Sequence, residues 1–320
     1  MPGVIERILV TGGSGLIGRR LLPVLVDAGH AVTLAQRALP EVQPGHRVAV
    51  VGISGIGPDT DWRPALEGCS AVIHLAGQTP GRGVPDSMFS IVNDKGTARL
   101  VEQAAVSGIE RFVFLSSVQA LTDHSDSRVL ADNSASRATS AYGLSKLAAE
   151  THVASLEKTG ILGVSLRPPL VVGVEARAGW MLLQRLAWSG LPLPFGGVTN
   201  RRSLVSIDNL VDAIATAVAR PWHQARAGSF LVADLEPVSL AEILAWLREG
   251  MGVPPRLLGM PPRLIAVSLK IIVQNDAAHK LLDDLQIDSS RFRDAYQWKP
   301  KLTAREGIIR SGRDFAARHS

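Results

Sequence analysis

Short apolar runs alternate with longer stretches of helical periodicity through the first half of the chain. The apolar runs predict strands at residues 8–10, 31–35, 47–51, 71–75, 111–115 and 163–166. The stretches between them predict helices at 16–28, which Gly29 ends, at about 90–107, and over a segment that ends near residue 159. Alternating strands and helices are typical of a parallel sheet covered on both faces. The predicted fold class is therefore α/β, with a doubly wound parallel sheet.

The pattern changes after Arg167, where prolines separate shorter helical stretches. This change predicts a smaller C-terminal lobe. We expect residues 1–166 to form the main domain, with about 206–234 returning to it, and residues 167–205 and 235–320 to form the lobe. The segment from 120 to 140 is polar, and it is expected to be a mobile loop beside the site.

Composition restricts the class of protein. The 320 residues are 46% hydrophobic and 20% charged, which is an ordinary globular balance that can bury a substantial core. The single cysteine, Cys69, excludes an internal disulfide and argues against a cysteine-based metal site, so no metal is expected and a reducing compartment fits best. The N-terminus lacks the pattern of a signal peptide. These features predict a cytoplasmic protein.

Membrane and nucleic-acid partners are disfavoured. The apolar stretch at 257–273 is interrupted by prolines and charges, so it predicts an amphipathic helix and no transmembrane segment; peripheral membrane contact remains the alternative. The net charge of +5 is compatible with a phosphorylated substrate. It is weak evidence for nucleic acid, because the basic residues are scattered and few aromatics accompany them.

Three glycines, Gly12, Gly15 and Gly18, follow the first predicted strand and open the first predicted helix. Their lack of a side chain allows a tight turn and a close approach of the backbone to a ligand, and the helix N-terminus then faces a pyrophosphate. The alternative is an ordinary strand-helix turn. The position after the first strand favours a Rossmann-type dinucleotide site.

The end of the second predicted strand bears on which dinucleotide binds. An acidic residue there would hold the ribose hydroxyls of NAD, but the chain has Gln36-Arg37 and no carboxylate until Glu41. Arg37 can reach a 2′-phosphate as a charged donor. The pair favours NADP(H) over NAD(H), the alternative being that Arg37 is a solvated surface residue.

Tyr142 and Lys146 lie one helical turn apart on a predicted helix, and Ser116-Ser117 end the strand before it. An ammonium near a phenol can lower the phenol pKa, so that the phenol passes a proton at neutral pH. Strand C-termini converge on the ligand crevice in this topology, so Ser117 can meet Tyr142. Separately, Ser117 could be a cap and Lys146 a solvated residue; together they predict a nicotinamide-dependent oxidoreductase.

Several motifs resemble those of the extended short-chain dehydrogenase/reductases that act on nucleotide sugars. They are Thr11–Gly18 (TGGSGLIG), His74–Gly77 (HLAG), Asn93–Thr97 (NDKGT), Phe112–Ser117 (FVFLSS), Tyr142–Lys146 (YGLSK) and Arg167-Pro168. The resemblance implies that Ser117 binds the sugar oxygen, Tyr142 exchanges its proton, and Lys146 binds the nicotinamide ribose and lowers the tyrosine pKa. His74 is assigned no chemistry. The cofactor-binding set that it implies is Gly12, Gly15, Leu16, Ile17, Gly18, Gln36, Arg37, Ala76, Gly77, Asn93, Tyr142, Lys146, Arg167 and Pro168.

The residues after Ser117 separate branches of this family. Its dehydratases place an Asp-Glu pair there, and its sugar-acid decarboxylases a Glu, whereas this chain has Val118-Gln119. A 4-epimerase or a 4-keto reductase remains. An epimerase recycles a tightly held NAD and a reductase draws on NADPH, so Gln36-Arg37 favours the reductase.

A finer resemblance is to a bacterial surface-polysaccharide subgroup, which includes 4-reductases making UDP-N-acetylquinovosamine. It is carried by Arg167–Gly173, Gly190–Gly196, Asn200–Val205, Asp208–Ala213 and Gln297–Pro300. Arg202, or its neighbour Arg201, would pair with the substrate diphosphate, unless these arginines are simply solvated. The substrate-binding set is Ser117, Gln119, Tyr142, Arg202 and Arg201.

The leading hypothesis is an NADPH-dependent reductase of a UDP-linked 4-keto-6-deoxy-N-acetylhexosamine in O-antigen or lipopolysaccharide precursor synthesis. The first alternative is an NAD-dependent UDP-glucose or UDP-N-acetylhexosamine 4-epimerase. A non-catalytic NADP-sensing protein is the second, although such relatives usually lose the tyrosine and lysine. The resemblance also implies a homodimer formed through two helices that flank the active site.

Overall fold

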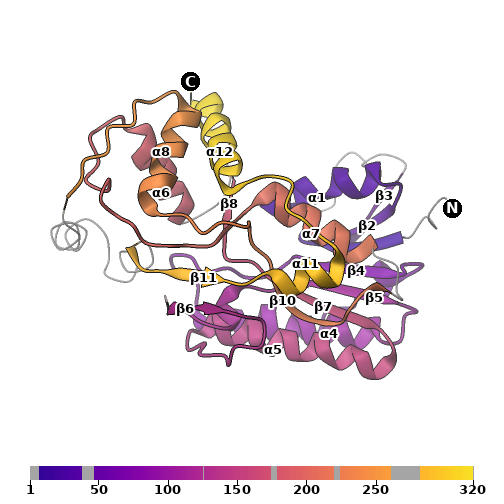
Figure 1. The fold of residues 1–320 in the computed structure, drawn as a ribbon. Helices are drawn as coiled ribbons and strands as arrows, with labels where there is room; N and C mark the ends of the chain where they lie inside the picture. The colour runs from indigo at the N-terminus through magenta and orange to yellow at the C-terminus, as the bar shows by residue number, and fades with distance from the viewer. Residues whose placement is uncertain are drawn as a thin grey trace.

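The computed structural model describes residues 7–37, 47–124, 126–173, 179–219, 224–260 and 282–319. Within these residues, the main sheet has seven parallel strands in the order β10-β7-β5-β4-β1-β2-β3 (Figure 1). The strands are β1 (Arg7–Thr11), β2 (Ala31–Gln36), β3 (Val48–Gly52), β4 (Ala71–His74), β5 (Arg111–Leu115), β7 (Leu162–Arg167) and β10 (Gly228–Leu231). The predicted doubly wound α/β fold is confirmed.

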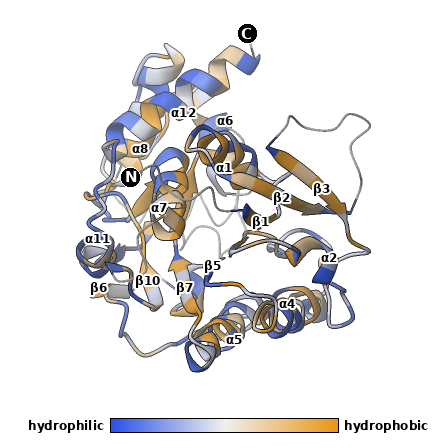
Figure 2. Cartoon of the chain, turned by 90° about the vertical axis from the view of Figure 1, so that its right-hand side faces the viewer, coloured by the Kyte–Doolittle hydropathy of each residue, from blue (hydrophilic) through white to orange (hydrophobic). Residues whose placement is uncertain are grey.

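Helices cover both faces of this sheet (Figure 2). One face carries α1 (Leu16–Asp27) and α7 (Ile207–Ala219), and the other carries α2 (Arg63–Leu66), α4 (Gly96–Ala104) and α5 (Ala141–Ser155). Successive residues of β1 serve the two faces: Ile8 and Val10 belong to the core beneath α1 and α7, and Leu9 to the core beneath α4 and α5. A strand that is buried on both faces reads as a continuous apolar run, as this one does.

A second group of helices packs around its own core, at the upper left of Figure 1. It consists of α6 (Gly179–Trp188), α8 (Leu240–Met251) and α12 (Ala304–His319), with β8 (Leu170–Val172) paired to β9 (Leu204–Ser206) nearby. The ends of α8 are specified locally, because Ser239 and Glu242 form a capping box and Gly252 adopts the left-handed conformation that ends the helix. In contrast, α11 (Ser290–Tyr296) lies beside β10 of the main sheet (Figure 1).

The polar segment at 120–140 is more ordered than its sequence suggests. The expectation of a loop is wrong here, because the segment contains β6 (Asp126–Leu130), which pairs in parallel with β11 (Leu285–Ile287). The short 3-10 helix η2 (Val118–Ala120) leads into it. The partner strand β11 comes from the other end of the chain, so the polar sequence around β6 could not predict that the two strands pair.

The helix predicted at about 90–107 covers two elements, the π-helical η1 (Ser90–Lys95) and α4, which ends at Ala104. The short helix α3 (Asp86–Phe89) comes directly before them, so the helical segment begins earlier than predicted. Wide turns such as that of η1 are rare in proteins, and those that occur often lie at functional sites. The helix predicted to end near residue 159 is confirmed, because η3 (Leu156–Thr159) continues α5 and Gly160 ends it.

Two features of the sequence lie outside the described residues, namely Glu41 and residues 261–273 of the apolar stretch. Among the helices that the structure does describe, we find none with the length and apolar character needed to cross a membrane.

Candidate active site

The glycine turn between β1 and α1 leaves a cradle beside the carboxyl end of the sheet. Gly12 has φ +74°, and a Cβ there would lie 2.7 Å from the backbone nitrogen of Ala76. A Cβ on Gly18 would lie 2.4 Å from the carbonyl oxygen of Gly12. Gly15 precedes α1 and provides no side-chain cap for the amides of Leu16 and Ile17 at its start. The cradle therefore fits a dinucleotide pyrophosphate at the helix N-terminus.

Gln36 and Arg37 stand at the end of β2, where the predicted ribose site lies. Gln36 is half-buried, and its carbonyl oxygen accepts a hydrogen bond from Ile53 of the neighbouring segment at 3.1 Å. Arg37 is exposed. Their contact with a cofactor phosphate stays a prediction.

Asn93 joins the segment that follows β4 to α5. Its Oδ1 accepts a hydrogen bond from the Gln78 amide at 2.7 Å, and its Nδ2 donates to the Gln78 carbonyl at 3.0 Å and to Ser145 Oγ at 3.1 Å. A Cβ on Gly77 would lie 3.0 Å from Asn93 Oδ1 and 3.3 Å from Lys146 Nζ. Glycine at 77 therefore lets both polar side chains reach the segment that contains Ala76.

Ser117 and Tyr142 meet in the structure, as the topology predicts. Ser117 follows β5 in an extended conformation, and its Oγ accepts a hydrogen bond from the Gln119 amide at 3.2 Å. Burial raises the pKa of the Tyr142 phenol above its usual value, and the hydrogen bond between Tyr142 and Ser117 opposes that rise. The phenol therefore keeps its proton at neutral pH in this state.

Lys146 is almost completely buried and points to the end of β5. Its Nζ donates to the Leu115 carbonyl at 2.9 Å and lies 4.7 Å from the centroid of the Phe114 ring. Burial lowers the pKa of Lys146 to about 8, against an opposing effect of Glu150. We expected Lys146 to lower the pKa of Tyr142, but the net shift of Tyr142 is upward. The reason is that the ammonium bonds to a carbonyl while the phenol is desolvated.

His74 ends β4 and holds neighbouring elements together. Its Nδ1 lies 2.7 Å from Thr11 Oγ1 and its Nε2 lies 3.0 Å from Thr97 Oγ1. Burial, assisted by the charge of Lys146, lowers the pKa of His74 to about 3. A neutral imidazole with both nitrogens engaged links β1, β4 and α4 and offers no proton for chemistry.

The structure also contains a buried ion pair between Arg167 and Glu150, and the sequence motifs did not predict the role of Glu150. Arg167 Nη2 lies 2.5 Å from Glu150 Oε2, and Arg167 Nη1 donates to the Asp132 carbonyl at 3.0 Å. The Pro168 carbonyl accepts a hydrogen bond from the Val118 amide at 2.9 Å. The predicted contact of Arg167 and Pro168 with cofactor remains untested. The one sequence signal for Glu150 was its place one turn after Lys146 on the same helix face.

Arg201 and Arg202 lie just before β9, and Arg202 forms isolated bridges with Val238 and Leu285. Arg202 is half-buried, and its Nη1 donates to the Asp283 carbonyl at 2.6 Å; burial lowers its pKa. Arg201 is exposed, and its amide donates to Asp284 Oδ1 at 2.7 Å. Gln119, in contrast, lies in η2 next to Ser117. The binding roles of these three residues stay predictions.

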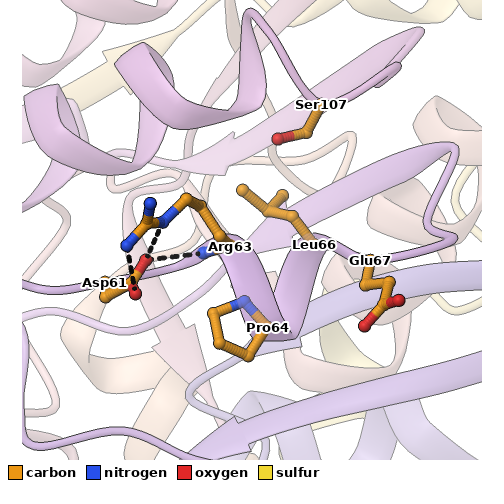
Figure 3. Close-up of a pocket in the computed structure, with 6 residues that line it drawn as sticks. All are labelled: Asp61, Arg63, Pro64, Leu66, Glu67 and Ser107. Carbon is orange, nitrogen blue, oxygen red and sulfur yellow. Dashed lines mark hydrogen bonds and ion pairs between the residues drawn. The ribbon is translucent and has the colours of Figure 1, made fainter.

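A surface hollow of about 600 Å³ lies at the opposite edge of the sheet (Figure 3). Its lining residues are Asp61, Arg63, Pro64, Leu66, Glu67 and Ser107. Because α2 leads into β4 and Ser107 precedes β5, the hollow is at the amino ends of these strands. Arg63 Nε is bonded to Asp61 Oδ1 at 2.7 Å on the exposed surface. Within the described residues, no group of three or more His, Cys, Asp or Glu side chains could hold a metal ion.

The fold, the glycine cradle and the Ser117, Tyr142 and Lys146 side chains are arranged as the chemistry of a nicotinamide-dependent enzyme requires. The chain belongs to the NAD dependent epimerase/dehydratase family, whose model matches residues 8–233. The sequence resemblance to extended short-chain dehydrogenase/reductases is therefore confirmed at the level of the family.

Individual relatives differ in the reaction that their names give. A UDP-glucose 4-epimerase of Vibrio cholerae is 32% identical over 326 residues, which cover 97% of this chain and 95% of that protein. A 2-alkyl-3-oxoalkanoate reductase of Stenotrophomonas maltophilia is 28% identical and covers 78% of this chain and 76% of its own. Among solved structures, a UDP-glucuronic acid 4-epimerase from Bacillus cereus in complex with NAD superimposes with a TM-score of 0.76 at 20% identity, covering 98% and 99% of the two chains.

Proposed function

We propose that the protein is a nucleotide-sugar 4-epimerase that inverts C4 of a UDP-linked hexose or N-acetylhexosamine. The observation that carries the proposal is the Ser117–Tyr142 pair beside the buried Lys146, at the edge of the sheet that also holds the glycine cradle. The 32% identity to the Vibrio cholerae 4-epimerase supports epimerisation as the reaction. This choice reverses the order of the two hypotheses drawn from the sequence.

The side chains suit proton transfer at a sugar hydroxyl. The glycine cradle would hold a dinucleotide whose nicotinamide, when bound, would supply reversible hydride transfer at the sugar C4. In its phenolate form, which the substrate-free site does not hold, Tyr142 Oη would remove the proton of the C4 hydroxyl as the ketone forms, and would give it back when the alcohol re-forms. Ser117 Oγ holds the same oxygen by a hydrogen bond, and Lys146 stabilises the phenolate form of Tyr142 by its charge.

We extend the proposal to the rest of the substrate. The part of the chain that contains α6, α8 and α12 would bind the nucleotide, with Arg202 or Arg201 at the diphosphate and Gln119 at the sugar. Arginine suits this job because its planar guanidinium makes two parallel hydrogen bonds to phosphate oxygens. A homodimer through the helices that flank the site belongs to the same proposal.

The proposed epimerase activity is tested by two measurements, the amount of NAD(H) bound to the purified protein and the conversion of the sugar. We expect about one equivalent of NAD(H) to be released from the purified protein on denaturation, and UDP-glucose or UDP-N-acetylglucosamine to be converted to its C4 epimer without added cofactor. Product is followed by NMR of the sugar anomeric proton. Protein that retains NAD(H) and converts neither sugar would contradict the proposal, and Tyr142→Phe is the control for adventitious activity.

The exposed Arg37 at the end of β2 favours a second candidate, the NADPH-dependent 4-keto reductase. A reductase binds NADPH from solution and oxidises it only when a UDP-linked 4-keto-6-deoxy sugar is present. Arg37→Ala should then weaken NADPH binding at least ~10-fold, which is ~1.4 kcal/mol, and leave NADH binding unchanged. Equal effects on both cofactors would remove the support that Arg37 gives to this candidate.

A further inference from the structure

Glu150 is a buried carboxylate that the proposed proton transfer does not use. It lies on α5 one turn beyond Lys146, and 4% of its surface is exposed. Its Oε1 accepts a hydrogen bond from Ser116 Oγ at 2.5 Å, and its Oε2 accepts one from Ser229 Oγ at 3.2 Å. The carboxylate therefore joins the helix of Tyr142 to the residue that follows β5 and to the first half of β10.

Arg167 completes the charge balance around Glu150. Its Nε donates to Glu150 Oε1 at 2.8 Å and its Nη2 to Glu150 Oε2 at 2.5 Å, and 6% of Arg167 is exposed. An ionised carboxylate is expensive to bury without such a partner. The pair ties the last residue of β7 to the middle of α5.

Lys146 faces several titratable groups on the elements that pack around it. On α5 these are Tyr142 and Glu150, and on β4 there is His74, which burial keeps neutral. Arg167 on β7 is paired with Glu150, and Asp94 on η1 is bonded to His152 at 2.8 Å. The negative charge of Glu150 opposes the effect of burial on the pKa of Lys146. Without that charge, desolvation alone would favour neutral lysine.

We propose that Glu150 is a positioning residue of the reaction: its charge, paired with Arg167 and one helical turn from Lys146, keeps Lys146 an ammonium ion, and its bond to Ser116 fixes the strand end that carries Ser117. This inference rests on the proposed role of Lys146 in stabilising the Tyr142 phenolate. Glu150 itself touches neither the sugar nor the cofactor in this scheme.

The pKa of Lys146, measured by NMR, tests the proposal without substrate or turnover. Lysine labelled with ¹³C at Cε is titrated in the wild-type protein, and Lys146→Met identifies its signal. Glu150→Gln should lower the pKa of Lys146 by about one unit or more, because the negative charge is lost while the burial of Lys146 remains. A purely structural role predicts an upward shift, because loosened packing admits water. An unchanged or raised value in Glu150→Gln overturns the proposal.

Matched variants control for folding. Glu157→Gln removes an exposed carboxylate from the segment that continues α5, and it should leave the pKa of Lys146 unchanged. Glu150→Asp keeps the charge and should restore most of the wild-type value. If Glu150→Gln does not fold, the double variant Glu150→Met with Arg167→Met replaces it, because it removes both charges and keeps the buried volume. The pKa of Lys146 should still fall in this variant, and an unchanged or raised value contradicts the proposal.

Activity provides a second readout. In Glu150→Gln the alkaline limb of the kcat profile should move to lower pH by the same amount as the pKa of Lys146, with KM for the sugar little changed. A uniform fall of kcat at all pH values would contradict the proposal. If Lys146 responds as predicted and no sugar is converted by the wild-type protein, the proposed function fails while the role of Glu150 in charging Lys146 stands.

Discussion

The two edges of the main sheet differ in what their polar residues do. At the carboxyl edge, Lys146 and Asn93 are buried, and their polar atoms bond to defined partners. At the amino edge, the hollow of about 600 Å³ is lined by Asp61 and Arg63, which pair with each other in solvent. The comparison teaches that volume alone does not mark a site of chemistry; desolvated titratable groups with specific partners do.

The physical basis of the difference is the direction of the strands. Because the strands are parallel, the segments that follow them converge at the carboxyl edge, where Thr11, His74 and Leu115 end their strands side by side. Ligands bind at this edge in open α/β sheets. The amino edge receives the ends of helices, whose surface side chains remain hydrated.

Tyr142→Phe should have the largest effect, because it removes the group that exchanges the proton while keeping the ring against Phe89. We expect kcat to fall by about 10²- to 10⁴-fold with the free energy of unfolding nearly unchanged. Turnover and urea denaturation measure the two quantities. A kcat within ~10-fold of wild type would mean that the carboxyl edge does not perform the proposed reaction.

Gly12→Ala should damage both stability and cofactor binding. The left-handed backbone costs a residue with a Cβ about 1–2 kcal/mol, and the new atom would lie 2.7 Å from the Ala76 nitrogen. Gly29→Ala is the matched control at the amino edge, with φ +95° and its nearest neighbour atom 3.5 Å away. We expect both variants to unfold at lower urea concentration, but only Gly12→Ala to lose NAD(P) affinity by calorimetry. If Gly12→Ala and Gly29→Ala bind NAD(P) with equal affinity, the glycine cradle does not bind the cofactor.

His74 should make the stability depend on pH. Its pKa is about 3 in the folded protein, well below the unfolded value near 6.5, so the unfolded state binds the proton first as pH falls. The stability that the neutral imidazole provides is present above pH ~6.5 and is lost as pH falls towards 3. Between pH 6.5 and 5 the loss is about 1.6 kcal/mol. Urea denaturation at these pH values gives the free energy of unfolding of the wild-type protein and of His74→Gln. If this free energy depends on pH equally in both proteins, the prediction is wrong.

Arg63→Ala should have the smallest effect. It breaks the exposed pair with Asp61 in the amino-edge hollow, where water screens both charges. We expect turnover, cofactor affinity and Tm to stay at wild-type values. A loss of activity in Arg63→Ala would overturn the contrast between the two edges.

Local patterns predicted the parallel sheet well, because strands buried on both faces are nearly all apolar. They failed at β6, whose partner β11 is remote in sequence, and at η1, where a wide π-helical turn interrupts an otherwise regular helix. At the site, motif spacing located Ser117, Tyr142 and Lys146, but it gave no sign that burial would raise the pKa of Tyr142. Desolvation depends on what the rest of the chain places around a side chain.

The sequence by itself determined the doubly wound fold, the glycine turn and the tyrosine–lysine pair, because each depends on residues within a few positions of one another. Only the tertiary structure decided the electrostatic state of the site. It buried Lys146 against Leu115, made His74 a neutral link between strands, and placed Glu150 between Arg167 and Ser116. Charges in a protein interior depend on distance and solvent exclusion, and the folded chain sets both.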